Sequence, residues 1–280
     1  MIWELRHEHK IGLLIEIADI PRSTYYYYSK QFDHPKPDRY AEIKTEIRRI
    51  YDESKGRYGY RRITKELKKK FVVNHKTVQK LMRKMGIFCR VRMHKYNSYK
   101  GDVGRIAPNL LERNFKADQP NQKWVTDVTE FALFGIKLYL SPIIDLYNGE
   151  VISYNLSRHP NLNQVTDMLE KAFTKIPDNT NLILHSDQGW QYQHKHYQKM
   201  LKEKGVRQSM SRKGNCLDNA MAENFFGIMK SELLYAEKFE SPEAFIKALN
   251  EYIDYYNNKR IKSRLNGKSP VQYRTLSITG

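Results

Sequence analysis

The sequence predicts an α/β domain built on a mixed sheet and preceded by an all-α basic region. Positive charge is concentrated in one segment, because residues 39–100 hold 20 lysines and arginines against 5 acids, while the whole chain of 280 residues has a net charge of +18. From Lys123 onward, short apolar runs typical of strands alternate with amphipathic helical runs, which is the pattern of an α/β fold. This change in composition indicates two regions with different functions.

The charge balance favours a polyanionic partner. An isoelectric point near 9.6 is typical of proteins that bind nucleic acid, and an anionic membrane surface is the rarer alternative. No apolar run approaches the roughly 18 residues of a spanning helix, and no signal peptide is recognisable, so we expect a soluble, cytoplasmic, nucleoid-associated protein without a membrane partner. The two cysteines, Cys89 and Cys216, are too few and too distant for a zinc knuckle.

The first segment, residues 1–37, is predicted to form a partial helix-turn-helix. Leu13, Leu14 and Ile17 recur at helical spacing, and Pro21 separates them from a second short helix that includes four consecutive tyrosines, residues 25–28. These tyrosines fit either a packed aromatic edge or a surface that stacks on bases.

Residues 38–97 are predicted to form a basic helix-turn-helix domain of three short helices. Isoleucines 43, 47 and 50 mark the first, and apolar residues at 60, 63 and 67 mark the second. Asn74 caps the third, which ends near Gly86. As a recognition helix, the third would present Lys76, Gln79, Lys80 and Arg83 to DNA. The alternative is a small helical bundle with a solvated basic face.

Residues 98–119 read as a linker, and residues 120–280 as the α/β core with a helical extension. Strands are expected over 123–134, 137–146 and 151–156, with a turn at Asn148-Gly149, and a further strand over 181–184. Helices are expected over 163–175 and 193–204. The polar run 209–213 reads as a loop.

Three acids stand out on these elements. Asp127 lies among apolar neighbours inside the first strand, where a carboxylate is costly unless it is paired or binds a metal. Asp187 follows a later strand, where sites of α/β folds collect. Glu223 lies in a helical run, residues 219–230, beside an apolar face, and Lys230 follows it two turns later on the same side.

If these carboxylates converge, they predict a centre for hard cations. Oxygen ligands suit Mg²⁺ or Mn²⁺, and two such ions can activate a nucleophilic oxygen and stabilise the leaving oxygen of a phosphodiester. Water as the nucleophile gives hydrolysis, whereas a DNA 3′-hydroxyl gives strand transfer.

The order of motifs resembles the catalytic core of the retroviral-integrase (DDE) superfamily. Trp124-Val-Thr-Asp127, His185-Ser-Asp187-Gln-Gly and Asn219-Ala-Met-Ala-Glu223-Asn-Phe-Phe carry the resemblance, and 35 residues separate Asp187 from Glu223. Lys230 matches the basic residue that follows the glutamate. The run Tyr256-Asn257-Asn258-Lys259-Arg260 is similar to a C-terminal motif of bacterial members. The chain most resembles the OrfB-type transposases of insertion sequences.

The resemblance implies a ribonuclease-H-like fold in which Asp127, Asp187 and Glu223 are the catalytic, metal-binding triad. It implies two Mg²⁺ ions, with Mn²⁺ as a substitute, and double-stranded DNA as substrate, cleaved at element ends and joined to a target. Lys230 would contact DNA near the cut. Tyr256, Asn257 and Arg260 have either a DNA contact or a structural role, with the structural role favoured.

The same resemblance implies partners. Joining two DNA ends generally needs at least a dimer, so we expect a homo-oligomer on DNA. The leucine-zipper segment of such transposases usually belongs to an upstream reading frame, so an upstream product or fusion is an expected partner.

Two alternatives to a transposase remain at this point. One is a non-catalytic DNA-binding regulator derived from a transposase, and the other is a metal-dependent nuclease without strand transfer. Among other polar residues, His185 reads as structural rather than as a base. Asp145 reads as a turn residue that could also approach the site.

Overall fold

The computed structural model describes residues 2–33, 38–90, 106–212 and 216–279, which fall into two compact units, 1–50 and 51–280. The first unit contains the helices α1 (Ile2–Leu5), α2 (Ile11–Ile17) and α3 (Arg22–Asp33). The expected domain boundaries near residues 37 and 97 fall in segments outside the described residues, as do residues 98–105 of the predicted linker.

The basic region contains the three predicted helices, α4 (Ala41–Glu53), α5 (Tyr60–Leu67) and α6 (His75–Lys84). The side chain of Asn74 accepts a hydrogen bond from the backbone N–H of Lys76 at 2.9 Å, which confirms the predicted N-cap. Helices α5 and α6 pack against each other, and the residues expected to face inward, Ile63 and Val78, are fully buried.

The core is built on one mixed sheet of six strands. These are β1 (Lys123–Thr126), β2 (Thr129–Leu133), β3 (Ile136–Asp145), β4 (Val151–Ser157), β5 (Ile183–Ser186) and β6 (Arg207–Met210). Strands β1 and β2 follow each other along one edge of β3, and β4 pairs with its other edge, all antiparallel. Strands β5 and β6 extend the sheet beyond β1 in parallel. The expected mixed sheet is confirmed.

Two predictions about strands were wrong. The run expected as one strand over 123–134 is two strands, because the chain leaves the sheet between Thr126 and Thr129. The polar run expected as a loop begins inside β6, because Ser209 is fully buried beside β5 and its hydroxyl is hydrogen-bonded. Polar side chains concealed this strand from the hydrophobic pattern.

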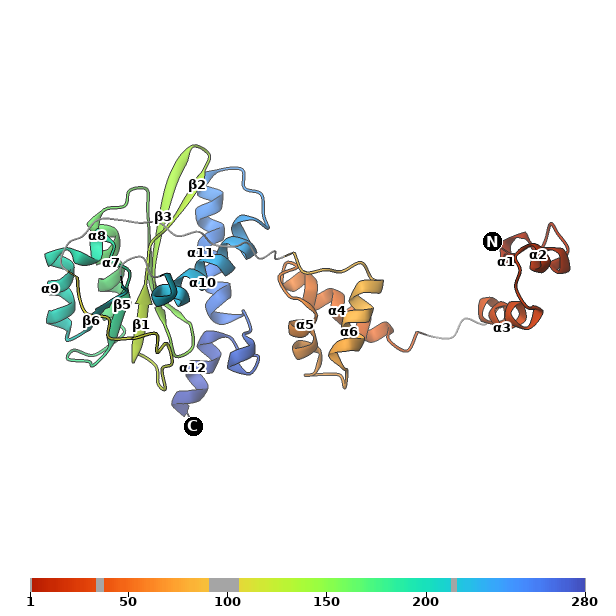
Figure 1. Ribbon diagram of the computed structural model, residues 1–280, viewed down its shortest axis with the longest axis horizontal. Coiled ribbons are helices and arrows are strands. Elements are labelled where there is room, and N and C mark those ends of the chain that lie inside the picture. The colour runs from red at the N-terminus through yellow and green to blue at the C-terminus, as the bar shows by residue number, and fades with distance from the viewer. Residues whose placement is uncertain (1, 34–37, 91–105, 213–215, 280) are drawn as a thin grey trace. The chain divides into compact units, whose positions relative to one another are not determined.

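Helices cover both faces of the sheet (Figure 1). One face packs on α7 (Leu162–Phe173) and α9 (Lys195–Lys204), which α8 (Trp190–Gln193) precedes. The other packs on α10 (Ala220–Met229) and α11 (Pro242–Asn258), and α12 (Pro270–Thr279) follows. The apolar face predicted for α10 is buried as expected, with Ala222, Phe225, Phe226 and Met229 all at most 7% exposed. No helix of the described residues is long and apolar enough to cross a membrane.

Candidate active site

Asp127 lies where the chain leaves the sheet. Trp124, Val125 and Thr126 are fully buried in β1, and the next residue, Asp127, is half-buried. One of its carboxylate oxygens, Oδ1, accepts a hydrogen bond from the backbone N–H of Val128 at 2.8 Å. The strand therefore ends by presenting a carboxylate at the border of core and solvent.

Asp187 reaches the same edge of the sheet from β5. Because β1 and β5 are parallel, with Val125 paired to His185, their carboxyl ends are adjacent. Asp127 and Asp187 are each two residues beyond that pair, so they leave the sheet side by side. Asp187 is also half-buried, and its Oδ1 accepts a hydrogen bond from the backbone N–H of Gly189 at 2.9 Å. This is the strand end where sites of α/β folds form.

Glu223 comes from the first turn of α10, a helix that contacts β1. Electrostatics link it to the aspartates. The pKa of Asp127 is raised well above its usual range by burial first, then by the negative charge of Asp187 and, more weakly, of Glu223. Burial also raises the pKa of Asp187. Asp127 therefore lies near enough to Asp187 and to Glu223 for both negative charges to act on it.

The positive charge of Lys230 opposes the rise in the Asp127 pKa. Burial lowers the pKa of Lys230 itself, while Glu130 and Asp127 favour its charged form. Its ammonium nitrogen lies 5.6 Å from the centre of the Phe131 ring. Lys230 thus reaches toward β2 and Asp127.

The donor set suits a hard divalent cation, because it consists of carboxylate oxygens whose mutual repulsion a cation would relieve. Among the described residues, no three His, Cys, Asp or Glu side chains are already drawn together as a complete ligand set. Carboxylates without a cation repel one another, so these side chains are not expected to close around an empty centre.

Comparison with known proteins identifies the family. A family model described as integrase core domain matches residues 117–216, a second of the same description matches 223–278, and an HTH-like domain matches 38–95. A putative transposase, InsK of insertion sequence element IS150 from Escherichia coli, is 52% identical over 97% of this chain and 95% of its own length. The chain belongs to the insertion-sequence transposases.

Further relatives are similar to this transposase. The transposase of insertion sequence element IS904 from Lactococcus lactis is 37% identical over 86% of this chain and 98% of its own length. Among solved structures, the integrase catalytic core domain of HTLV-2, in complex with magnesium, is 19% identical over 57% of this chain and 99% of that chain, with a TM-score of 0.47. The ribonuclease-H-like fold predicted from the sequence agrees with the matched integrase core family and with the strand order.

Sequence reasoning missed Tyr192, which lies behind the two aspartates of the transposase. Its side chain is fully buried, and its pKa is raised well above the usual range by burial first and then by Asp127 and Asp187. Its ring packs edge-on against Tyr197, with 5.4 Å between ring centres. Tyr192 is the third residue of α8, shortly after Asp187, and this proximity in sequence was the only hint. A tyrosine on the apolar face of a helix usually has only a packing role.

Asp145 does not belong to the site. Its Oδ2 accepts hydrogen bonds from the backbone N–H of Asn121 and from Arg274, both at 2.8 Å, and its Oδ1 accepts from the backbone N–H of Tyr147 at 2.9 Å. The side chain is fully buried. The hydrogen bond to Tyr147 supports the turn role, and pairing with Trp124 places Asp145 at the start of β1, whereas Asp127 follows its end.

The DNA contact considered for Tyr256 and Arg260 is wrong, because both residues are only 3% exposed. Arg260 donates two hydrogen bonds to the buried carboxylate of Glu232, from Nε at 2.8 Å and from Nη2 at 2.6 Å. The hydroxyl of Tyr256 accepts a hydrogen bond from the ammonium of Lys262 at 2.7 Å. These side chains hold the interior of the transposase together and have no surface to offer to DNA.

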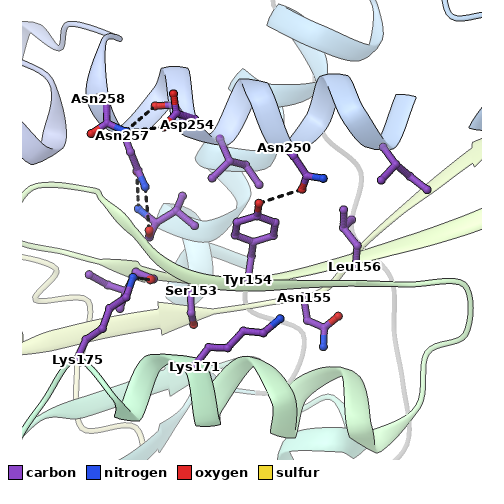
Figure 2. A pocket seen from close by; sticks show the side chains of 14 residues that line it. Ser153, Tyr154, Asn155, Leu156, Lys171, Lys175, Asn250, Asp254, Asn257 and Asn258 are labelled. Atoms are coloured by element: carbon purple, nitrogen blue, oxygen red, sulfur yellow. Dashed lines mark hydrogen bonds between the residues drawn. The ribbon is translucent and has the colours of Figure 1, made fainter. Parts of the chain in front are cut away.

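Asn257 also has a structural position. Its amide oxygen accepts from the backbone N–H of Val151, and its amide nitrogen donates to the backbone carbonyl of the same residue, both at 2.9 Å (Figure 2). The side chain therefore pairs with the outer edge of β4 as a neighbouring strand would. This pairing supports the structural role that the sequence favoured for Asn257.

The residues predicted to read DNA lie together on the surface of α6. Lys76, Gln79, Lys80 and Arg83 are all exposed, while Val78, Leu81 and Met82 between them are buried. The spacing places the exposed side chains on one side of the helix. This arrangement is what a recognition helix requires. The contact of these four side chains with DNA stays a prediction.

Proposed function

We propose that Asp127, Asp187 and Glu223 of this DNA transposase hold two divalent metal ions, Mg²⁺ or its substitute Mn²⁺. The observation that carries the proposal is the parallel pairing of β1 and β5, which brings two aspartates to one edge, together with the electrostatic interaction between Asp127 and Glu223. When bound, two such ions would supply activation of the attacking oxygen and neutralisation of the leaving oxygen in phosphodiester displacement.

The protein's own groups would orient the DNA for this reaction. The carboxylates lie at the border of core and solvent, which gives a scissile phosphate access to them. Lys230 would neutralise a phosphate next to the cut, because its ammonium is directed toward Asp127. Water as the nucleophile would release the 3′ end of the element, and that 3′-hydroxyl would then attack the target strand.

DNA-end recognition is assigned in this proposal to the basic region. Lys76, Gln79, Lys80 and Arg83 of α6 would enter the major groove or contact phosphates.

Pairing of two ends would need a homo-oligomer on DNA, and an upstream reading-frame product or fusion would complete the active transposase. Domain boundaries at residues 37, 97 and 119 would separate the N-terminal segment, the basic domain, the linker and the core. The acidic site favours an enzyme over a regulator without activity, and an enzyme that acts on bacterial DNA would work in the cytoplasm, at the nucleoid.

The test is an end-joining assay with a labelled duplex that carries the element's terminal sequence. We expect nicked and joined products that require Mg²⁺ or Mn²⁺ and that fall by roughly a hundredfold or more in Glu223→Gln, since loss of a partner even outside the ligand set typically costs ten- to a hundredfold. Glu203→Gln, an exposed acid on α9 paired with Lys199, is the matched control and should keep full activity.

Each outcome decides between functions. Nicks without joined products would identify a nuclease. If Glu223→Gln cut and joined as well as the wild type, the assignment of the triad would be wrong. If the wild type binds the duplex but neither cuts nor joins it, a fusion with the upstream product separates an incomplete transposase from a regulator.

A further inference from the structure

Asp218 is an acid outside the triad that lies just before α10, and its hydrogen-bond partners differ from those of the triad. The side chain of Asp218 is completely inaccessible, and both of its oxygens are hydrogen-bonded. Arg212 donates from Nε at 3.0 Å and from Nη2 at 3.2 Å, and Arg113 donates from Nε at 2.9 Å. The hydrogen bonds from Arg212 are the main cause that holds the pKa of Asp218 far below its usual range, although burial opposes them. Asp218 is therefore ionised at neutral pH.

This carboxylate joins three separate segments of the core. Asn109 Nδ2 also donates to the Asp218 carboxylate, at 3.1 Å. Asn109 and Arg113, which both belong to the segment that precedes β1, are therefore hydrogen-bonded to Asp218. Arg212 follows β6 and adds its backbone N–H at 3.1 Å. Asp218 itself lies in the short 3₁₀ helix Cys216–Asn219, which leads directly into α10. Its position thus fixes where the catalytic helix begins.

The segment that contains Arg212 is also hydrogen-bonded to the two neighbours of Asp187. The backbone N–H of Ser211 donates to the carbonyl of Ser186 at 2.9 Å, and Gln188 Nε2 donates to the carbonyl of Ser211 at 2.9 Å. Both neighbours of Asp187 are therefore bonded to the residue before Arg212. A continuous chain of hydrogen bonds runs from the neighbours of Asp187 through Ser211 and Arg212 to Asp218.

We propose that Asp218 is a positioning residue that sets the distance between Glu223 and Asp187 required for metal binding. Glu223 lies five residues after Asp218, and only the N-cap residue Asn219 stands between Asp218 and α10, so a shift at the start of α10 moves the Glu223 carboxylate with the helix. Removing the Asp218 charge would leave the guanidiniums of Arg212 and Arg113 without their shared acceptor. Because these side chains are 60% and 46% exposed, they could turn into solvent and release the three segments. The inference rests on the proposed metal-binding role of Glu223.

The test measures Mn²⁺ binding directly, by electron paramagnetic resonance titration of the full chain without DNA. We expect Asp218→Asn to weaken Mn²⁺ binding about tenfold, as loss of groups that orient metal ligands typically does. Arg212→Lys keeps the positive charge but loses the paired geometry, so it should weaken binding in the same direction. Asn257→Ala is the control for stability, because it removes hydrogen bonds from the core at the edge of β4 and should leave Mn²⁺ affinity unchanged.

Glu223→Gln serves as the reference for the metal site. If Glu223→Gln weakens Mn²⁺ binding and the Asp218→Asn and Arg212→Lys variants do not, the positioning role is overturned while the proposed function stands. If Glu223→Gln itself leaves Mn²⁺ binding unchanged, the metal assignment fails first. If Asp218→Asn does not fold, Arg212→Lys decides alone. Equal weakening by Asn257→Ala would show a general stability effect and would also overturn the proposal.

Discussion

At the scale of single residues, burial decides which protonation state a side chain keeps. His185 follows Leu184 in β5, is fully buried, and its Nδ1 is 2.8 Å from the hydroxyl of Ser209. Burial lowers its pKa to about 4, so its ring is neutral at neutral pH. A neutral ring hydrogen-bonded inside the sheet supports the structural role that the sequence favoured for His185.

We predict from this shift that His185 destabilises the protein in mild acid. Below pH 6.5 the unfolded chain binds a proton at this residue and the folded chain does not, so the free energy of unfolding should fall as the pH drops from about 6.5 to about 4. The full difference amounts to about 3 kcal/mol. Urea unfolding at pH 7 and pH 4.5 measures most of this difference in the free energy of unfolding.

The comparison variant for this prediction is His185→Asn, which cannot take up the proton. The raised pKa values of Asp127 and Asp187 act in the opposite direction, because protonated acids favour the folded state there. Both proteins contain these two aspartates. Subtracting the pH dependence of the variant's free energy of unfolding from that of the wild type therefore removes their contribution. An equal loss of stability in both proteins between the two pH values would contradict the prediction.

At the scale of elements, the outer edge of β4 shows how one side chain can complete a sheet. A groove of about 670 Å³ runs along this edge between α7 and α11 (Figure 2). At one end Asn257 pairs with the backbone of Val151, and the ammonium of Lys175 donates to the carbonyl of Ile152. Edge strands without such partners pair with other chains.

We therefore expect Asn257→Ala to lower the free energy of unfolding by about 1–3 kcal/mol, because it leaves a largely buried N–H and carbonyl without partners. Asn258→Ala is the matched control, since the neighbouring amide bonds only to Asp254 of its own helix at the surface. Its effect should be smaller than about 0.5 kcal/mol. Urea unfolding of both variants checks the difference, and equal effects would refute the role of Asn257.

A second element-scale feature follows the catalytic helix directly. The π-helical turn Lys230–Leu234 carries Glu232, which is 2% exposed and accepts hydrogen bonds from Arg260 and from the hydroxyl of Tyr252. Burial would raise the pKa of Glu232, but the bonds from Arg260 outweigh it and lower the pKa. Truncating one partner of such a buried pair is costly, and Glu232→Ala should destabilise the protein by about 3–5 kcal/mol in thermal or urea unfolding. A loss below about 1 kcal/mol would contradict this.

At the scale of the whole molecule, the excess of positive charge governs binding to DNA. The net charge of +18 attracts any DNA, but only cations that contact phosphates release counterions. The exposed cations of α6 are the predicted contacts, whereas those of α9 lie on a helix for which no DNA contact is predicted.

Replacing Lys76, Lys80 and Arg83 together by glutamine should reduce the salt dependence of DNA binding. The slope of log affinity against log salt concentration should fall by about 3, if each cation contacts one phosphate. The control replaces Lys195, Lys199 and Lys202 of α9, which removes the same net charge. Fluorescence anisotropy with a labelled duplex measures both. Equal slopes for the two triple variants would exclude α6 as the DNA-contacting helix.

The sequence by itself determined the parts of this protein that depend on local pattern. Helical spacing placed α4, α5 and α6, the Asn74 cap, and the buried face of α10 correctly, because a one-sided apolar stripe must be buried. The order and spacing of the three motifs indicated the family and the candidate triad. Polar β6 was missed, because a strand packed by hydrogen bonds has no apolar alternation to recognise.

Only the tertiary structure decided which polar residues share a site. Asp127 and Asp187 meet because β1 and β5 are parallel neighbours, although 60 positions of sequence separate them. Burial turned Tyr256 and Arg260 from possible DNA contacts into core residues, and long-range hydrogen bonds made Asp218 the junction of three segments. Sequence specifies the chemistry of each side chain, but partners and exposure arise from long-range packing that local pattern does not contain.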